Sequence, residues 1–86
     1  MRLKDGFIAQ NVNGTQFLVS IGGEQFGGIV RSNPSAAFIV DQLCEETDPT
    51  RIADAMCRKY DAPRELIESD VERILQILRS IGALEE

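Results

Sequence analysis

Histidine and tryptophan are absent from this chain of 86 residues, and cysteine occurs only twice. Without histidine, acid–base catalysis at neutral pH would need a carboxylate or a lysine with a strongly shifted pKa. The two thiols, Cys44 and Cys57, lie 13 residues apart in helix-like segments and form no C-x-x-C pair. This spacing does not match a zinc site, and we interpret both as ordinary thiols rather than as a disulfide or a nucleophile. We therefore expect no metal ion, no cofactor and no enzyme activity.

Glycine motifs for phosphate binding and long apolar runs are absent as well. Neither G-x-x-x-x-G-K-[ST] nor G-x-G-x-x-G occurs, so nothing indicates a nucleotide site. No segment approaches the roughly 18 apolar residues of a membrane span, and the first residues lack the apolar core of a signal peptide. We expect a cytoplasmic protein that does not associate with membranes.

Basic residues are too few and too scattered for a nucleic-acid-binding surface. The chain has 9 Lys and Arg against 14 Asp and Glu, a net charge of −5, and its bases are spread from Arg2 to Arg79. A protein that binds nucleic acid must neutralise phosphates, which an acidic surface opposes. We expect no nucleic-acid partner.

A composition of 43% hydrophobic and 27% charged residues is typical of one globular domain, here residues 1–86. Asn13-Gly14 predicts a hairpin between strands 7–12 and 15–21, because a type I′ turn needs positive φ at both central residues. Alternation along these strands gives one face that we expect to be the core face: Ile8, Val12, Phe17, Val19 and Ile21. The opposite face carries a Phe7/Leu18 patch, which we expect the termini or a partner to cover, with Ala9, Gln16 and Ser20.

A third strand is predicted at residues 29–31, after a glycine-rich segment (22–28) for which we have no interpretation, and three helices follow. Asn33-Pro34 and Asp48-Pro49 each place a capping side chain before a proline at the first helical position. Pro63 is expected to open the last helix and Gly82 to end it, and Ala83-Leu84 could form a short tail strand. We expect helices over residues 34–46, 49–60 and 63–81. In the first, the expected inward residues are Ala37, Phe38, Val40, Leu43 and Cys44. In the second they are Ile52, Ala53, Met56, Cys57 and Tyr60.

The last predicted helix carries two rows of side chains. An apolar stripe repeats at steps of four and three residues: Ile67, Val71, Ile74, Leu78 and Ile81. Beside it lies a mixed row: Leu66, Asp70, Arg73 and Ile77. If the third strand has a free edge, an extended peptide could pair with that edge while the mixed row forms the opposite wall of a groove. The plainer interpretation is a wider core stripe beside a solvated ion pair.

Six segments, in order over nearly the whole chain, carry a family resemblance. They are KDGFI (4–8), the hairpin at Asn13-Gly14, GIVRSNPSAAFI (28–39), Tyr60-Asp61, Asp70-Val71 and IGAL (81–84). In this order and spacing the chain resembles coenzyme PQQ synthesis protein D, the PqqD family. The resemblance implies an α+β fold, a small winged helix-turn-helix-like domain in which a three-stranded antiparallel sheet precedes three helices (β-β-β-α-α-α).

The resemblance also implies a function without catalysis. Members recognise ribosomally made, post-translationally modified peptides: they bind the leader segment of a precursor peptide as a fourth strand. They then present it to a modifying enzyme, often a radical S-adenosylmethionine protein. The product would be PQQ or another modified peptide, and we favour the latter. Carried onto this sequence, the site lies on the third strand and the facing helix: Gly28, Ile29, Val30, Arg31, Ser32, Asp70, Arg73, Ile74, Ile77 and Leu78.

Two other classes of function stay open. A winged-helix nucleic-acid regulator has the same order of elements, but it should present several Arg or Lys from one helix, and here the bases alternate with acids. A protein–protein adaptor or a weak homodimer could use the Phe7/Leu18 patch.

Overall fold

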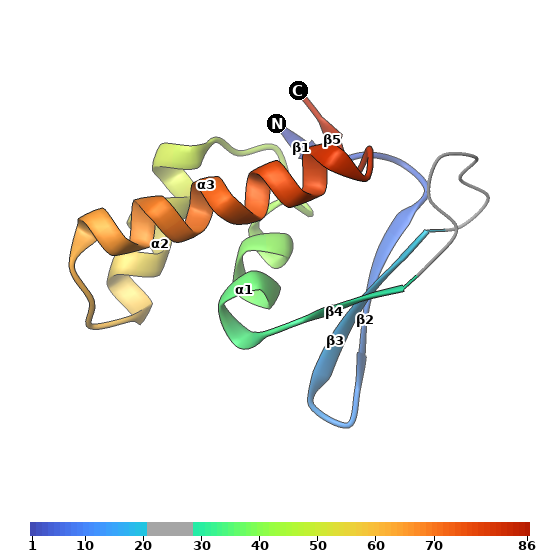
Figure 1. Ribbon diagram of the computed structural model, residues 1–86, viewed down its shortest axis with the longest axis horizontal. Helices are drawn as coiled ribbons and strands as arrows, with labels where there is room; N and C mark the ends of the chain where they lie inside the picture. The colour runs from blue at the N-terminus through green and yellow to red at the C-terminus, as the bar shows by residue number, and fades with distance from the viewer. Residues whose placement is uncertain (21–28) are drawn as a thin grey trace.

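The computed structural model describes residues 1–20 and 29–86, with residues 29–32 described by their backbone alone. Ile21 and the glycine-rich segment, including Gly28 of the expected site, lie outside the described residues. Figure 1 shows the chain as a small α+β unit with the helices at one end and the strands at the other. The elements follow in this order: β1 (Arg2–Leu3), β2 (Phe7–Val12), β3 (Thr15–Ser20), β4 (Ile29–Ser32), α1 (Pro34–Gln42), α2 (Pro49–Lys59), α3 (Arg64–Ser80) and β5 (Leu84–Glu85).

The predicted hairpin and its register are confirmed. β2 and β3 pair antiparallel with Val12 opposite Thr15, and β4 adds antiparallel to β3, giving the order β2-β3-β4. The turn residues Asn13 and Gly14 have φ of 52° and 81°. These positive angles are what a two-residue type I′ connection requires, and they explain the Asn-Gly pair.

The prediction of which hairpin face meets the core was wrong. Leu18 is 1% exposed and Gln16 is 3% exposed, whereas Ile8 and Val12 are 43% and 52% exposed. The face with Phe7, Ala9 and Leu18 therefore packs inward, and the face expected to be the core is the outer one. Both faces carry apolar residues, so alternation could not choose between them. The choice is made by α1, which packs against β3 and β4.

A second sheet joins the two ends of the chain and was only half expected. β1 pairs antiparallel with β5 in a two-stranded sheet. A tail strand after Gly82 was predicted. β1 was not predicted, because a segment of two residues is too short to show alternation. The predicted order β-β-β-α-α-α was therefore incomplete. The backbone N–H of Leu3 donates to the carbonyl of Leu43 (2.8 Å), and that of Lys4 to the carbonyl of Ala83 (2.8 Å). β1 thereby ties the end of α1 to the end of α3.

The helix starts at the two Asx-Pro pairs are confirmed. Asn33 accepts a hydrogen bond from the backbone of Ala36, and Asp48 accepts one from the backbone of Arg51. Pro63 precedes α3 without a side-chain cap, so its expected place as the first helical residue was wrong by one position. α1 ends at Gln42 rather than Glu46. The carbonyl of Leu43, which a longer helix would have used internally, is taken by β1.

The core lies between α1, α2, α3 and the inner face of the sheet. On α3 the stripe Ile67, Val71, Ile74 and Leu78 is buried as predicted, and Leu75 is buried with it. The prediction for the first helix was partly right: Val40 and Leu43 are buried as predicted, whereas Cys44 is exposed and Ala37 and Phe38 are half-buried. Ala36 and Ile39 are buried as well.

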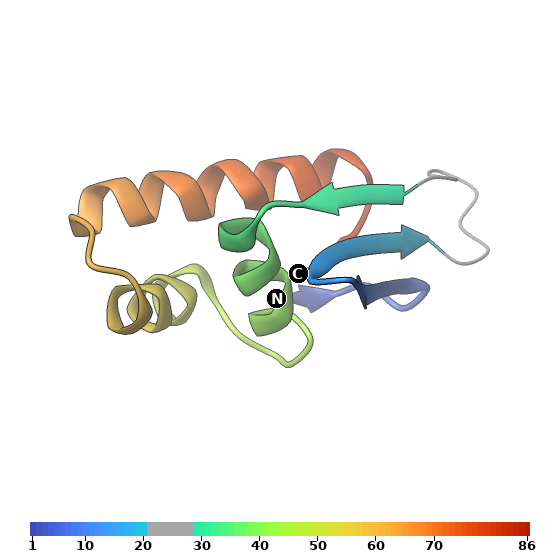
Figure 2. The same ribbon diagram turned by 90° about the horizontal axis from the view of Figure 1, so that it is seen from below.

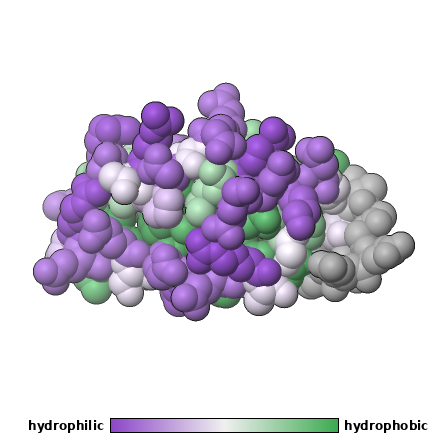
Figure 3. Space-filling model, turned by 90° about the horizontal axis from the view of Figure 1, so that it is seen from above, coloured by the Kyte–Doolittle hydropathy of each residue, from purple (hydrophilic) through white to green (hydrophobic). Residues whose placement is uncertain are grey.

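Hydrophilic side chains cover most of the face seen in Figure 3 and surround a small apolar area near its middle. Within residues 1–20 and 29–86, no helix is both long enough and apolar enough to cross a membrane.

Candidate functional site

The candidate site begins with the free edge of β4. This strand pairs with β3 from Val19↔Ile29 to Gln16↔Ser32, and among the described residues no strand pairs with its other edge. In an antiparallel strand, alternate residues direct their backbone N–H and C=O to opposite edges. Half of the backbone groups of β4 are therefore available to another extended chain.

α3 forms the second wall. Seen from below in Figure 2, α3 lies beyond β4, on the side away from β3, and no described segment lies between the two. In this view the order is β2, β3, β4 and then α3. A strand added to β4 would therefore continue the sheet toward α3, and the side of α3 that faces β4 decides which side chains it meets.

The mixed row of α3 is solvent-accessible along its whole length. Leu66 and Ile77 are 60% and 46% exposed, which is unusual for large apolar side chains on a helix that otherwise buries its apolar residues. Between them, Arg73 donates from Nη2 to Oδ1 of Asp70 at 3.3 Å. This pair is exposed, so its contribution to stability is at most about 1 kcal/mol and both side chains are free to re-pair. Leu66, which the expected site left out, completes the row.

Two expected site residues lie in the core instead. Ile74 is 9% exposed and Leu78 is 3% exposed, so neither offers much surface to a ligand. They hold α3 against the rest of the fold and so position the mixed row. The structure thus brings Asp70, Arg73 and Ile77 to the surface of one helix. For Ile29–Ser32 it describes the paired backbone and not the side chains.

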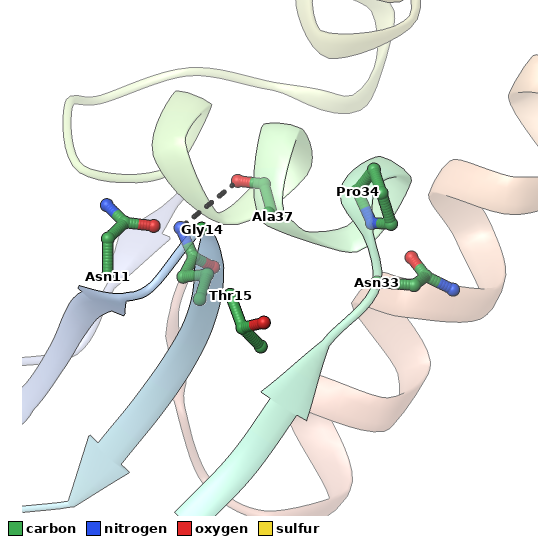
Figure 4. Close-up of a pocket in the computed structure, with 7 residues that line it drawn as sticks. Asn11, Gly14, Thr15, Asn33, Pro34 and Ala37 are labelled. Atoms are coloured by element: carbon green, nitrogen blue, oxygen red, sulfur yellow. Dashed lines mark hydrogen bonds between the residues drawn. The ribbon is translucent and has the colours of Figure 1, made fainter.

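A separate open pocket of about 560 Å³ lies between the hairpin turn and the start of α1. It is lined by Asn11, Gly14, Thr15, Gln16, Asn33, Pro34 and Ala37 (Figure 4). None of these residues carries a charge and none lies on α3, so the pocket is distinct from the β4–α3 site. In the part of the chain that the structure describes, no cluster of His, Cys, Asp or Glu is arranged to hold a metal ion.

Comparison with known proteins identifies the family. A family model described as coenzyme PQQ synthesis protein D (PqqD) matches residues 12–84. The chain belongs to the PqqD family. The predicted resemblance is thereby confirmed over residues 12–84, which leaves out the segment KDGFI (4–8). No curated protein matches it in sequence.

Two solved structures resemble this PqqD-family chain over nearly its whole length. One is TbiB1 in complex with the TbiA(beta) leader peptide, with a TM-score of 0.85 and 25% identity, covering 99% of this chain and 95% of that one. The other is lasso peptide synthetase B1 complexed with its leader peptide, with a TM-score of 0.79 and 25% identity, covering 98% of this chain and 96% of that one. Both similar proteins were therefore solved with a leader peptide bound.

Proposed function

We propose that this protein is a non-enzymatic, cytoplasmic peptide chaperone. It binds the leader segment of a ribosomally made precursor peptide by strand addition to β4, and it presents that peptide to an enzyme that modifies it. The fold that carries this activity is, in our interpretation, of the winged helix-turn-helix-like class.

The free edge of β4, with α3 beyond it, is the observation that carries the proposal, and we propose that the exposed row of α3 faces that edge. Strand addition supplies affinity through backbone hydrogen bonds, which any sequence can make, and specificity through pockets for alternate side chains. Here Leu66 and Ile77 offer apolar contact, and Asp70 and Arg73 offer polar contact of either sign. Family membership and the two leader-bound structures support the same assignment.

Presentation to an enzyme needs no reactive group on this chain. Holding the precursor beside an enzyme converts a bimolecular encounter into one at high effective concentration. We propose a modifying enzyme as the second partner. A radical S-adenosylmethionine protein is one class to test. A component of a lasso peptide synthetase is another, because one of the two leader-bound structures is named as lasso peptide synthetase B1. A modified peptide other than PQQ is the product that we favour.

The charges on α3 argue against the nucleic-acid alternative. Arg64 contacts Asp54 at 2.8 Å and Glu68 at 3.1 Å, and Arg79 contacts Glu86 at 2.9 Å. These neighbouring carboxylates offset the positive charge that would attract phosphates.

The experiment is an NMR titration of the ¹⁵N-labelled protein with synthetic peptides copied from short open reading frames that neighbour its gene. We expect shifts at residues 28–32 and in the Asp70–Ile77 part of α3. The variant Ile77→Glu should lose affinity about tenfold or more, because it places a charge against an apolar contact. Gln76→Glu adds the same side chain one residue away, on another face of α3, and should bind normally. Binding without shifts at β4, or equal losses in both variants, would refute the proposal.

A further inference from the structure

Two aromatic rings and a lysine form a compact cluster where α1 meets the end of α2. The ring centroids of Phe38 and Tyr60 are 6.0 Å apart, with an interplanar angle of 83°. Nζ of Lys59 lies 4.8 Å from the centroid of Phe38 and 5.7 Å from that of Tyr60. Both rings are half-buried, whereas Lys59 and its neighbour Arg58 are exposed. The sequence predicted Phe38 and Tyr60 only as core residues.

The charges of Arg58 and Lys59 are unusual for this acidic chain. Most cations of the described chain are held by a carboxylate within 4 Å: Arg2, Arg51, Arg64, Arg73 and Arg79. Arg58 and Lys59 form no such pair among the described residues. Their place in the last turn of α2 suits the carbonyl end of a helix. That role accounts for positive charge at this position, but it does not account for the two half-buried rings beside it.

The cluster lies at the end of the molecule toward which β4 points. β4 runs into α1, whose second turn carries Phe38, and Tyr60 closes α2 just before the loop to α3. In Figures 1 and 2 this loop reaches the N-terminal end of α3, the end that carries the exposed Leu66. A peptide that leaves the β4–α3 groove at this end therefore emerges at the end of the molecule that carries the α2–α3 loop.

We infer that Arg58, Lys59, Phe38 and Tyr60 form an accessory site for an acidic segment of the bound precursor peptide. The inference rests on the proposed function. Because the sheet is antiparallel throughout, a fourth strand would run opposite to β4 and would have its N-terminus at the α1 end. The acidic residues therefore precede the segment that pairs with β4.

The chemistry of the cluster suits this occupant. Asp or Glu side chains of the peptide can pair with Arg58 and Lys59. Cation–π attraction keeps Lys59 over the faces of the two rings. The rings also offer apolar area to the methylene groups of the peptide. Attraction between exposed charges also speeds encounter and weakens as salt rises.

The experiment is a display selection from a random library of 16-residue peptides, so it does not need the natural precursor. Three forms of the whole chain serve as bait: wild type, Arg58→Gln/Lys59→Gln, and the control Lys4→Gln/Arg51→Gln. Both double variants change the net charge from −5 to −7, so they differ only in where the charge is lost. Circular dichroism and NMR spectra establish that each bait is folded.

We expect wild type and the control to enrich peptides with an apolar, strand-forming segment preceded by Asp or Glu. The Arg58/Lys59 variant should enrich the segment without the acids. A selected acidic peptide should bind this variant about five- to tenfold more weakly than wild type at low salt, with a flatter salt dependence. The control should bind as wild type does.

The outcomes separate the two proposals. Enrichment of strand-forming peptides with no acidic bias, or with acids only on the C-terminal side, overturns the accessory site and leaves the proposed function standing. An equal loss of affinity in both double variants also overturns it, because a general charge effect would then explain the result. Failure of every bait to enrich any peptide overturns the proposed function together with the inference.

Discussion

Gln16 on β3 donates a hydrogen bond from Nε2 to Oδ1 of Asp41 on α1, with 2.9 Å between the two atoms. The same nitrogen lies 3.5 Å from the carbonyl oxygen of Ala37, as drawn in Figure 4. Gln16 is 3% exposed, and its Oε1 is buried without a partner among the described residues. A polar side chain thus joins sheet and helix at a position where most proteins would place an apolar one. The nitrogen is satisfied and the oxygen is not.

Replacing Asp41 and replacing Gln16 should change the free energy of unfolding by different amounts. Asp41→Ala leaves a buried N–H group without its main acceptor, and we expect it to lower the free energy of unfolding by about 1 kcal/mol. Gln16→Leu removes the unpaired oxygen together with the nitrogen and should change stability little or raise it. Urea unfolding of the two variants and of the double variant measures this. If Gln16→Leu were the more destabilising change, the hydrogen bond would matter more than the buried oxygen.

The reversed hairpin face predicts a contrast in stability. Leu18→Ala should cost about 2–5 kcal/mol, because it opens a cavity at a fully buried site. Ile8→Thr and Val12→Thr keep β-branched residues on the outer face and should each cost less than about 0.5 kcal/mol. Urea unfolding decides between the two faces, and a large loss for Ile8→Thr with a small one for Leu18→Ala would restore the face expected from the sequence.

The hairpin shows why some features of the fold were readable from the sequence and others were not. Asn13-Gly14 determined the turn and the register, because only a few residues tolerate positive φ. The same argument succeeded for Asn33 and Asp48, whose side chains cap helices through local contacts. The inner face of the hairpin depends on where α1 packs, which is a long-range property. A buried Gln16 on one face and an exposed Val12 on the other could not be predicted from alternation.

For the candidate site, the sequence predicted which residues of α3 lie in one row better than it predicted how deeply each side chain is buried. The spacing of Leu66, Asp70, Arg73 and Ile77 placed these four on one side of the helix. Ile74 and Leu78 were added by family resemblance, and both are core residues. The cluster around Lys59 was missed because Phe38 and Tyr60 come from separate helices, and nothing local in the sequence shows that they meet.

The thiol of Cys44 should react slowly at neutral pH. Although Cys44 is exposed as a residue, partial desolvation of its thiol raises its pKa, and the negative charges of Asp41 and Glu45 raise it further. A higher pKa means a smaller thiolate fraction at any given pH, and only the thiolate is nucleophilic. In a Cys57→Ser background, alkylation by iodoacetamide followed by mass spectrometry should therefore show a rate profile displaced to higher pH relative to the protein in urea.

Glu45→Gln provides the control for that displacement. It removes one of the two charges without touching the thiol, and it should move the profile of the folded protein part of the way back toward lower pH. Coincident profiles for folded and unfolded protein would show that the surroundings of Cys44 do not affect its ionisation.

Backbone pairing at β4 predicts a pattern of period two in the peptide. Once a binding peptide is in hand, each residue of its paired segment can be N-methylated in turn, which removes one N–H donor and leaves the side chain in place. Alternate residues of an added strand direct their N–H groups toward β4, and the residues between them direct theirs away. We expect affinity to fall about tenfold or more at every second position and to change little at the positions between, as measured by calorimetry.

Ile77→Glu should weaken all of these peptides alike, because it acts on side-chain contacts and not on the backbone ladder. A period of three to four residues would instead indicate a helical ligand lying against α3, and uniform losses would indicate recognition by side chains alone.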